Sequence, residues 1–179
     1  MDERNTDRFH FRRNLLRAGA LIGASALLAP RAPAQERDVG HKANQTTGDN
    51  MPLARIDIST EASAELVSIV GAAIYGAMVA VADVPANDHF QVVHRHAADE
   101  IIYPKDGYLG LHYTNSLIII QVTWVRGRTT EAKKQFFHRV ANEIHEKGGV
   151  RKEDVWINLV DCAREDWSFG NGEMQYAPK

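Results

Sequence analysis

The chain has 179 residues, of which 44% are hydrophobic and 25% are charged, and its formal net charge is −2. A chain of this length and apolar content can bury a core, which argues against disorder throughout. The charge lacks the basic excess of a phosphate-binding surface, so no nucleic-acid partner is expected. Cys162 is the only cysteine, which excludes a disulfide within the chain.

Residues 1–34 have the layout of an export signal. Arg12 and Arg13 precede a weakly apolar run, Ala18 to Ala29, and the small residues of a cleavage site follow at positions 32–34. The run is shorter than the roughly 20 residues that cross a bilayer, so no stable membrane anchor is expected. The paired arginines resemble a twin-arginine signal, which would place the full-length product in the periplasm. The alternatives are an amphipathic or disordered extension, and upstream DNA translated from a wrongly chosen start codon.

Residues 35–51 are rich in Asn, Gln, Thr, Gly and charged residues and have no apolar period. This composition predicts a flexible linker. Residues 52–179 are then the one folded domain of the chain.

The first half of the domain is predicted to form a strand, a long helix and a second strand. Residues 53–58 are the first strand, and Ser59-Thr60-Glu61 offers a hydroxyl cap and a carboxylate for the start of the helix. A stripe at helical spacing contains Leu66, Ile69, Val70, Ala73, Ile74, Ala77, Met78 and Val81. Residues 83–85 end the helix, and 90–94 form the returning strand.

The second half repeats this order after a longer stretch with turns, residues 97–116. Residues 117–125 are almost continuously apolar, which predicts a strand that is covered on both faces. Thr129-Thr130-Glu131 repeats the helix cap, Gly148-Gly149 ends the helix, and 155–160 form the last strand. The apolar face of this helix contains Ala132, Phe136, Val140 and Ile144.

The two halves also correspond in sequence. Ser59-Thr60-Glu61-Ala62 matches Thr129-Thr130-Glu131-Ala132, and residues 84–90 match 150–156. Two such units predict right-handed β-α-β crossovers that share one sheet. The expected fold is α/β (α+β), a duplicated β-α-β two-layer sandwich of one sheet with two long helices.

Four motifs in this order resemble a known family. They are Met51-Pro52-Leu53, the segment VPANDHFQ at 84–91, Arg126-Gly127-Arg128, and DWSFG at 166–170. Together they resemble the tautomerase superfamily, and within it the malonate semialdehyde decarboxylases, over the whole of residues 52–179. Each motif is weak alone, and the four at compatible spacing are far more specific.

The resemblance implies a cofactor-independent enzyme that acts on small oxo acids and assembles as a homotrimer. It implies that Pro52, freed by removal of the methionine before it, is the catalytic amine, since a free α-amino group titrates near neutrality. It further implies that Asp88 positions or activates the reacting partner. Arg126 and Arg128 would bind the substrate carboxylate and stabilise an enolate.

Other interpretations of these residues stay open. Asp88 has a counterpart in Asp154, and in the structural interpretation both cap the turn into a strand. The arginines can be a solvated loop pair. Trp167, Phe169 and Gly170 can be structural residues that close the C-terminal turn over the pocket or over a neighbouring subunit. His94 and His96 point to one face if they share a strand, and His112 could join them in binding a metal ion. A metal site is not expected, because no carboxylate or cysteine ligand pattern accompanies these histidines.

The export signal conflicts with a catalytic proline. If the chain starts at Met1 and is cut after Ala34, the nitrogen of Pro52 is a tertiary amide and not a base. Translation from Met51, or a second proteolytic cut, would free the amine, and a Met51 start would leave the protein in the cytoplasm. Otherwise the chain is an exported, non-catalytic binding or structural protein with this fold.

Overall fold

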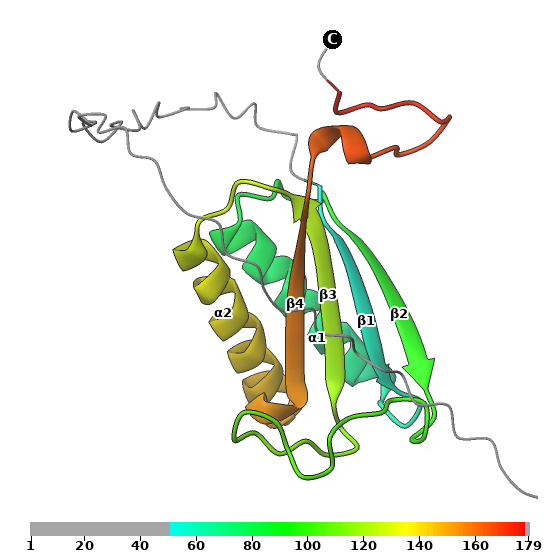
Figure 1. Ribbon diagram of the computed structural model, residues 1–179, viewed down its shortest axis with the longest axis vertical. Coiled ribbons are helices and arrows are strands. Elements are labelled where there is room, and N and C mark those ends of the chain that lie inside the picture. The colour runs from blue at the N-terminus through cyan, green and yellow to red at the C-terminus, as the bar shows by residue number, and fades with distance from the viewer. Residues whose placement is uncertain (1–50, 178–179) are drawn as a thin grey trace, which may run out of the picture. The chain divides into compact units, whose positions relative to one another are not determined.

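The computed structural model describes residues 51–177. The predicted signal over 1–34 and nearly all of the linker over 35–51 lie outside these residues, and both stay predictions. The elements, shown in Figure 1, are β1 (Leu53–Ser59), α1 (Ala64–Val81), β2 (Phe90–His96), β3 (Ile118–Val125), α2 (Thr130–Gly148) and β4 (Val155–Cys162), with short 3-10 helices η1 (Lys152–Asp154) and η2 (Arg164–Asp166).

The four strands form one sheet in the order β2-β1-β3-β4. β1 is parallel to β2 and β3 is parallel to β4, as two β-α-β units require, while β1 and β3 pair antiparallel in the middle. Both helices cover the same face of the sheet (Figure 1). The predicted duplicated two-layer sandwich is therefore confirmed.

The start of α1 differs from the prediction, whereas that of α2 agrees with it. β1 continues through Ser59, which pairs with His96, and the helix begins at Ala64 after an N-cap at Ser63. The Ser63 hydroxyl accepts a hydrogen bond from the Leu66 N–H at 3.0 Å. The predicted cap at Ser59-Thr60-Glu61 is wrong because Ser59 pairs with His96 of β2 and the Thr60 N–H donates to the His96 carbonyl. In α2, Thr129 is the N-cap, as its hydroxyl accepts from the Ala132 N–H at 3.2 Å.

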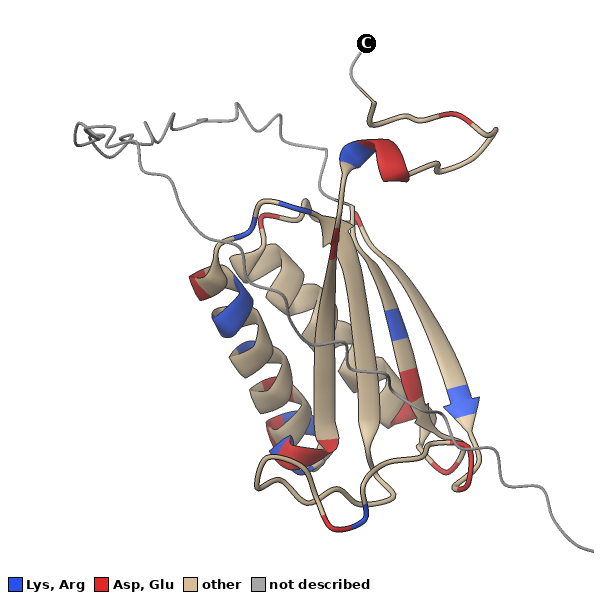
Figure 2. Cartoon of the chain, in the orientation of Figure 1, with Lys and Arg blue, Asp and Glu red and all other residues tan. Residues whose placement is uncertain are grey.

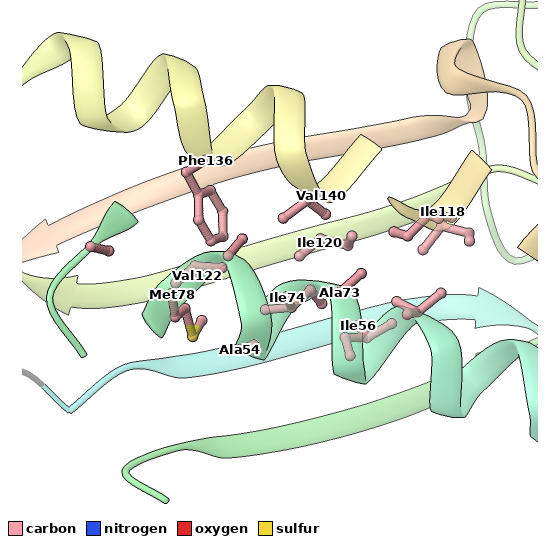
Figure 3. Close-up of a cluster of buried hydrophobic side chains, with 14 of the residues drawn as sticks. Ala54, Ile56, Ala73, Ile74, Met78, Ile118, Ile120, Val122, Phe136 and Val140 are labelled. Atoms are coloured by element: carbon pink, nitrogen blue, oxygen red, sulfur yellow. The ribbon is translucent and has the colours of Figure 1, made fainter. Parts of the chain in front are cut away.

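The core lies between the helices and the sheet. Figure 3 shows side chains of α1 and α2 meeting alternate residues of β1 and β3. Trp124 and Phe136, both fully buried, make an edge contact with ring centroids 5.4 Å apart. α1 has the length and apolar composition of a membrane-spanning helix, and here its stripe packs in the core at Val70, Ala73, Ile74, Ala77 and Met78.

The opposite face of the sheet carries no helix among the described residues. On β3 the positions that face the helices are buried and the alternating ones are half-buried, so the predicted cover on both faces is wrong for a single chain. Several large apolar side chains of this face are exposed, including Phe90 (58%), Trp156 (43%) and Val160 (36%). At one end, the segment before β3 forms an apolar cavity of about 320 Å³ lined by Tyr103, Tyr113, Leu117, Ile119 and Trp156.

Candidate active site

The strand directions bring all four motifs to one end of the sheet. Leu53, the first residue of β1, pairs with Phe90 at the start of β2 and with Thr123 near the end of β3. Val125, the last residue of β3, pairs with Cys162 at the end of β4. Pro52, the turn before β2, the turn after β3 and the chain after β4 therefore meet at this end, which is the upper end in Figure 1.

Pro52 is buried and lies against a cavity of about 300 Å³. Its carbonyl accepts a hydrogen bond from the Phe90 N–H at 3.3 Å, which fixes it beside β2. The cavity walls are mostly apolar and come from three parts of the chain. They include Leu53, Phe90, Gln91, Val92, Trp167, Ser168 and Phe169.

The C-terminal aromatic residues are thus part of the site. Trp167 and Phe169 stack with ring centroids 5.5 Å apart, and both line the Pro52 cavity. This placement agrees with the prediction that these residues close the C-terminal turn over the pocket. The DWSFG resemblance was the only signal for it, because no local pattern relates residue 167 to residue 52.

Asp88 lies in the turn before β2. Its N–H donates to the Pro85 carbonyl at 3.2 Å, and Asn87, in the left-handed region, donates to the Tyr75 hydroxyl at 2.7 Å. Burial raises the pKa of the Asp88 carboxyl, and the nearby His89 opposes that shift. Within residues 51–177 this carboxylate has no hydrogen-bond partner, and it does not line the Pro52 cavity.

Asp154, the counterpart in the second repeat, is bonded differently. It is fully buried, and its carboxylate accepts from the Thr114 N–H at 2.7 Å and from the Thr114 hydroxyl at 2.9 Å. Arg151 lies 3.8 Å away. The turn-cap interpretation therefore fits Asp154, which anchors the segment before β3, and the contacts of Asp88 do not follow it.

This difference predicts opposite outcomes for two matched substitutions. Asp154→Ala should lower the free energy of unfolding by about 3 kcal/mol, because buried donors lose a charged acceptor. Asp88→Ala should change it by less than about 0.5 kcal/mol, since no partner is lost. Urea denaturation of both variants measures the two values. Equal losses would mean that both aspartates serve the fold in the same way.

Arg126 and Arg128 follow β3 and differ in their contacts. Figure 2 shows basic segments in the turn between β3 and α2. Arg126 is exposed, and its main-chain N–H donates to the Cys162 carbonyl at 2.9 Å. The Arg128 guanidinium donates to the Ala82 carbonyl at 3.2 Å and to the Val125 carbonyl at 2.5 Å. It also lies over the Trp124 ring, 4.4 Å from the centroid.

The environment of Arg128 is that of a side chain held by the fold. Burial lowers the pKa of its guanidinium, and the charges of Asp161 and Asp83 oppose that shift. Its Nη2 is buried and has no hydrogen-bond acceptor among the described residues. Neither arginine lines the Pro52 cavity in the single chain, although both lie at the same end of the sheet.

A second charged cluster at this end was not expected from the sequence. Asp161 accepts from the Trp124 indole N–H and from the Lys133 ammonium, each at 2.6 Å. Burial favours the neutral form of Asp161, but these bonds and the charges of Lys133 and Arg128 outweigh it and lower its pKa. Cys162 is half-buried, its thiol donates to the Trp124 carbonyl at 3.2 Å, and burial raises its pKa.

The histidines that were considered as metal ligands lie elsewhere. His96 contacts Asp57 at 2.7 Å, and His94 lies 3.4 Å from the same carboxylate oxygen. His112 is beside Gly107 in the segment between β2 and β3. Over residues 51–177, no three His, Cys, Asp or Glu side chains are arranged to hold a metal ion.

A family model described as "Tautomerase enzyme" matches residues 88–170. The probable tautomerase YusQ of Bacillus subtilis (strain 168) is 38% identical over 125 residues, which is 70% of this chain and 98% of that protein. The chain belongs to the tautomerase family. The resemblance of the four motifs is confirmed at this level, and so is the relation to a family of isomerases and decarboxylases.

Two solved structures have the same fold as this tautomerase-family protein. FG41 malonate semialdehyde decarboxylase inhibited by 3-bromopropiolate is 36% identical with a TM-score of 0.64, over 69% of this chain and 93% of that one. A fused 4-OT symmetric trimer is 21% identical with a TM-score of 0.56, over 68% and 94%. The second likeness shows the fold alone.

Proposed function

We propose that this tautomerase transfers a proton to or from a carbon of small oxo acids, with the amine of Pro52 as the proton carrier and without a cofactor. The observation that carries the proposal is the place of Pro52, which is buried at the head of β1 against an aromatic cavity of about 300 Å³. A cavity of this size suits a small organic acid. The similarity to a malonate semialdehyde decarboxylase supports the same substrate class.

The chemistry needs one proton site beside a developing enolate. In decarboxylation, the bond between the carboxylate carbon and its neighbour breaks, CO₂ leaves, and the electron pair forms an enolate. The enolate carbon takes a proton from the Pro52 ammonium, which is reloaded from water. In ketonisation of an enol, the same ammonium protonates carbon while the enol hydroxyl gives up its proton to water, and water reprotonates the Pro52 amine. Asp88 would position or activate the water or hydroxyl that takes part.

The arginines would supply the charge that holds the acid. Arg126 is exposed at the end of β3 and can form a bidentate pair with a carboxylate. Arg128 would add its remaining donor, Nη2, while its other contacts hold the turn. The arginine pair and the Pro52 cavity lie at the same end of the sheet. A substrate whose carboxylate is bound by the arginines would therefore extend across this end to the Pro52 cavity.

Arg126→Ala should therefore lower kcat/KM by about 30-fold, or about 2 kcal/mol, with an unchanged free energy of unfolding. Arg128→Ala should lower both, because the Ala82 and Val125 carbonyls lose their donors. Arg139→Ala is the matched control, since this α2 arginine pairs with Glu143 within the helix. Steady-state kinetics with an acid and with its ester separate charge recognition from folding. Unchanged kinetics for Arg126→Ala would return the residue to the solvated-loop interpretation.

A homotrimer is the proposed assembly. The sheet face without helices exposes Phe90, Trp156 and Val160, and a neighbouring copy would cover them. A related fold is known as a symmetric trimer, which supports this choice. Size-exclusion chromatography with light scattering measures the mass directly.

The mature N-terminus decides whether the protein is a catalyst or an exported, non-catalytic binding or structural protein. The match to YusQ covers 98% of that protein, so this domain alone makes up a tautomerase relative. We propose that the active form begins at Pro52, made from Met51 or by a second cut, and that the full-length product is periplasmic. An exported binding or structural protein is the alternative if Pro52 stays acylated. N-terminal sequencing of protein from the native host tells these apart.

The direct test uses the chain that begins at Pro52. It should accelerate the ketonisation of phenylenolpyruvate, followed by the loss of the enol absorbance, because a poised amine beside a carboxylate-binding arginine suits this reaction. A panel of small 3-oxo acids tests decarboxylation in parallel. A protein of confirmed mass and fold that accelerates none of these reactions would leave the non-catalytic alternative.

A further inference from the structure

The chain after β4 returns to the start of β1. Trp167 and Phe169 line the Pro52 cavity, and Tyr176 extends the stack, with its ring centroid 4.7 Å from that of Phe169. Three aromatic rings from the C-terminal segment thus lie in a row that ends near the head of β1.

This segment is held in place by its own hydrogen bonds. The Gln175 side chain accepts from the Phe169 N–H at 2.9 Å and donates to the Gly170 carbonyl at 3.0 Å. Between Phe169 and Gln175, the backbone turns through positive φ angles at Gly170 (147°), Asn171 (56°) and Gly172 (72°). The amide of Gln175 therefore ties the end of this turn back to its start at Phe169 and Gly170, and this fixes the position of the next residue, Tyr176.

The Tyr176 hydroxyl meets the main chain next to the candidate catalytic nitrogen. It accepts a hydrogen bond from the Met51 N–H at 3.3 Å, across 125 positions of sequence. Met51 is the residue whose removal would free Pro52. Without Met51, this N–H is gone, and the next nitrogen along the chain is the Pro52 amine.

We propose that Tyr176 is a further active-site residue of the reaction, and that its hydroxyl accepts a hydrogen bond from the Pro52 ammonium, directly or through one water, and orients the remaining proton toward the cavity. The inference rests on the proposed function, because it needs a chain that begins at Pro52. The ammonium has two N–H groups, so one can be held by the hydroxyl while the other faces the substrate. A hydrogen bond to the charged form also favours that form.

The test is Tyr176→Phe in the chain that begins at Pro52. Phenylalanine keeps the ring against Phe169 and removes only the hydroxyl. We expect kcat/KM to fall about tenfold, the scale of a hydrogen bond to a charged group. The amine should titrate at lower pH, because its charged form loses an acceptor, so the alkaline limb of the pH–rate profile should move to lower pH. Nitrogen-15 NMR of Pro52 follows the same titration without substrate.

Tyr103→Phe is the matched control. Its hydroxyl donates to Asn115 at 3.0 Å at the other end of the sheet, so this variant should leave the rate and the Pro52 titration unchanged. An unchanged Pro52 titration and an unchanged rate in Tyr176→Phe would overturn the inference. The NMR titration separates this result from a failure of the proposed function, because it reports the hydroxyl even if the parent chain turns over no substrate.

Discussion

The chain that begins at Pro52 is expected to be about 10²-fold faster, or more, than a chain that keeps residues 35–51, with any small oxo acid that the shorter chain accepts. Acylation of the proline nitrogen removes both its proton site and its positive charge. In the longer chain that nitrogen belongs to the Met51–Pro52 peptide bond, and the Met51 N–H is held by Tyr176. Values of kcat/KM for the two purified chains give the ratio.

Intact mass must accompany these rates, because slow trimming to Pro52 would mimic activity of the longer chain. Both chains should have the same free energy of unfolding, since the buried core lies within residues 54–163. Full activity of a longer chain whose mass is unchanged would exclude the terminal amine as the catalyst. Steric block by the added residues is a separate cause of low activity, and the next substitution distinguishes it.

Pro52→Ala is expected to lower kcat/KM by about 10²-fold in the chain that begins at this residue, the scale of a lost proton-transfer group. Alanine keeps an amine, but the nitrogen is no longer fixed by the pyrrolidine ring beside the cavity. In the chain that keeps residues 35–51, the same substitution should change almost nothing, because the nitrogen is already an amide. The two backgrounds form a double-mutant cycle.

A purely steric effect of the added residues would give a different cycle. The substitution would then lower the residual rate of the longer chain by the same factor as in the shorter one. A rate for Pro52→Ala equal to that of the parent in the shorter chain would remove Pro52 from the mechanism. Circular dichroism checks that the variant folds, since Pro52 is buried.

The fold was accessible from the sequence because its elements are strongly periodic and occur twice. The stripe of α1, the cap at Thr129 and the parallel pairs all follow from local pattern. The predicted start of α1 failed because Ser59 has two uses, as a cap or as a strand residue. Pairing with His96 decides between them, and that partner lies far along the chain.

The site was accessible only in part. The motifs identified Pro52, Asp88 and the arginines, and strand directions bring these to one end. They did not separate Arg128, which donates to main-chain carbonyls, from Arg126, which is exposed. The contacts of Asp161 and Tyr176 join residues that are far apart in sequence, and neither residue type nor spacing indicates such a contact.

The duplication of the β-α-β unit has a consequence for where the proposed amine can lie on this sheet. Leu53 pairs with Phe90 beside the cavity of about 300 Å³, and Ile119 pairs with Trp156 beside the cavity of about 320 Å³ at the other end. The repeat thus makes two pockets of similar size from equivalent positions. Only β1 can begin a chain, whereas β3 is always preceded by Leu117 and the segment before it. The two halves are alike in shape. A terminal amine can lie only beside the pocket of the first half, because the start of β3 is joined to the chain before it.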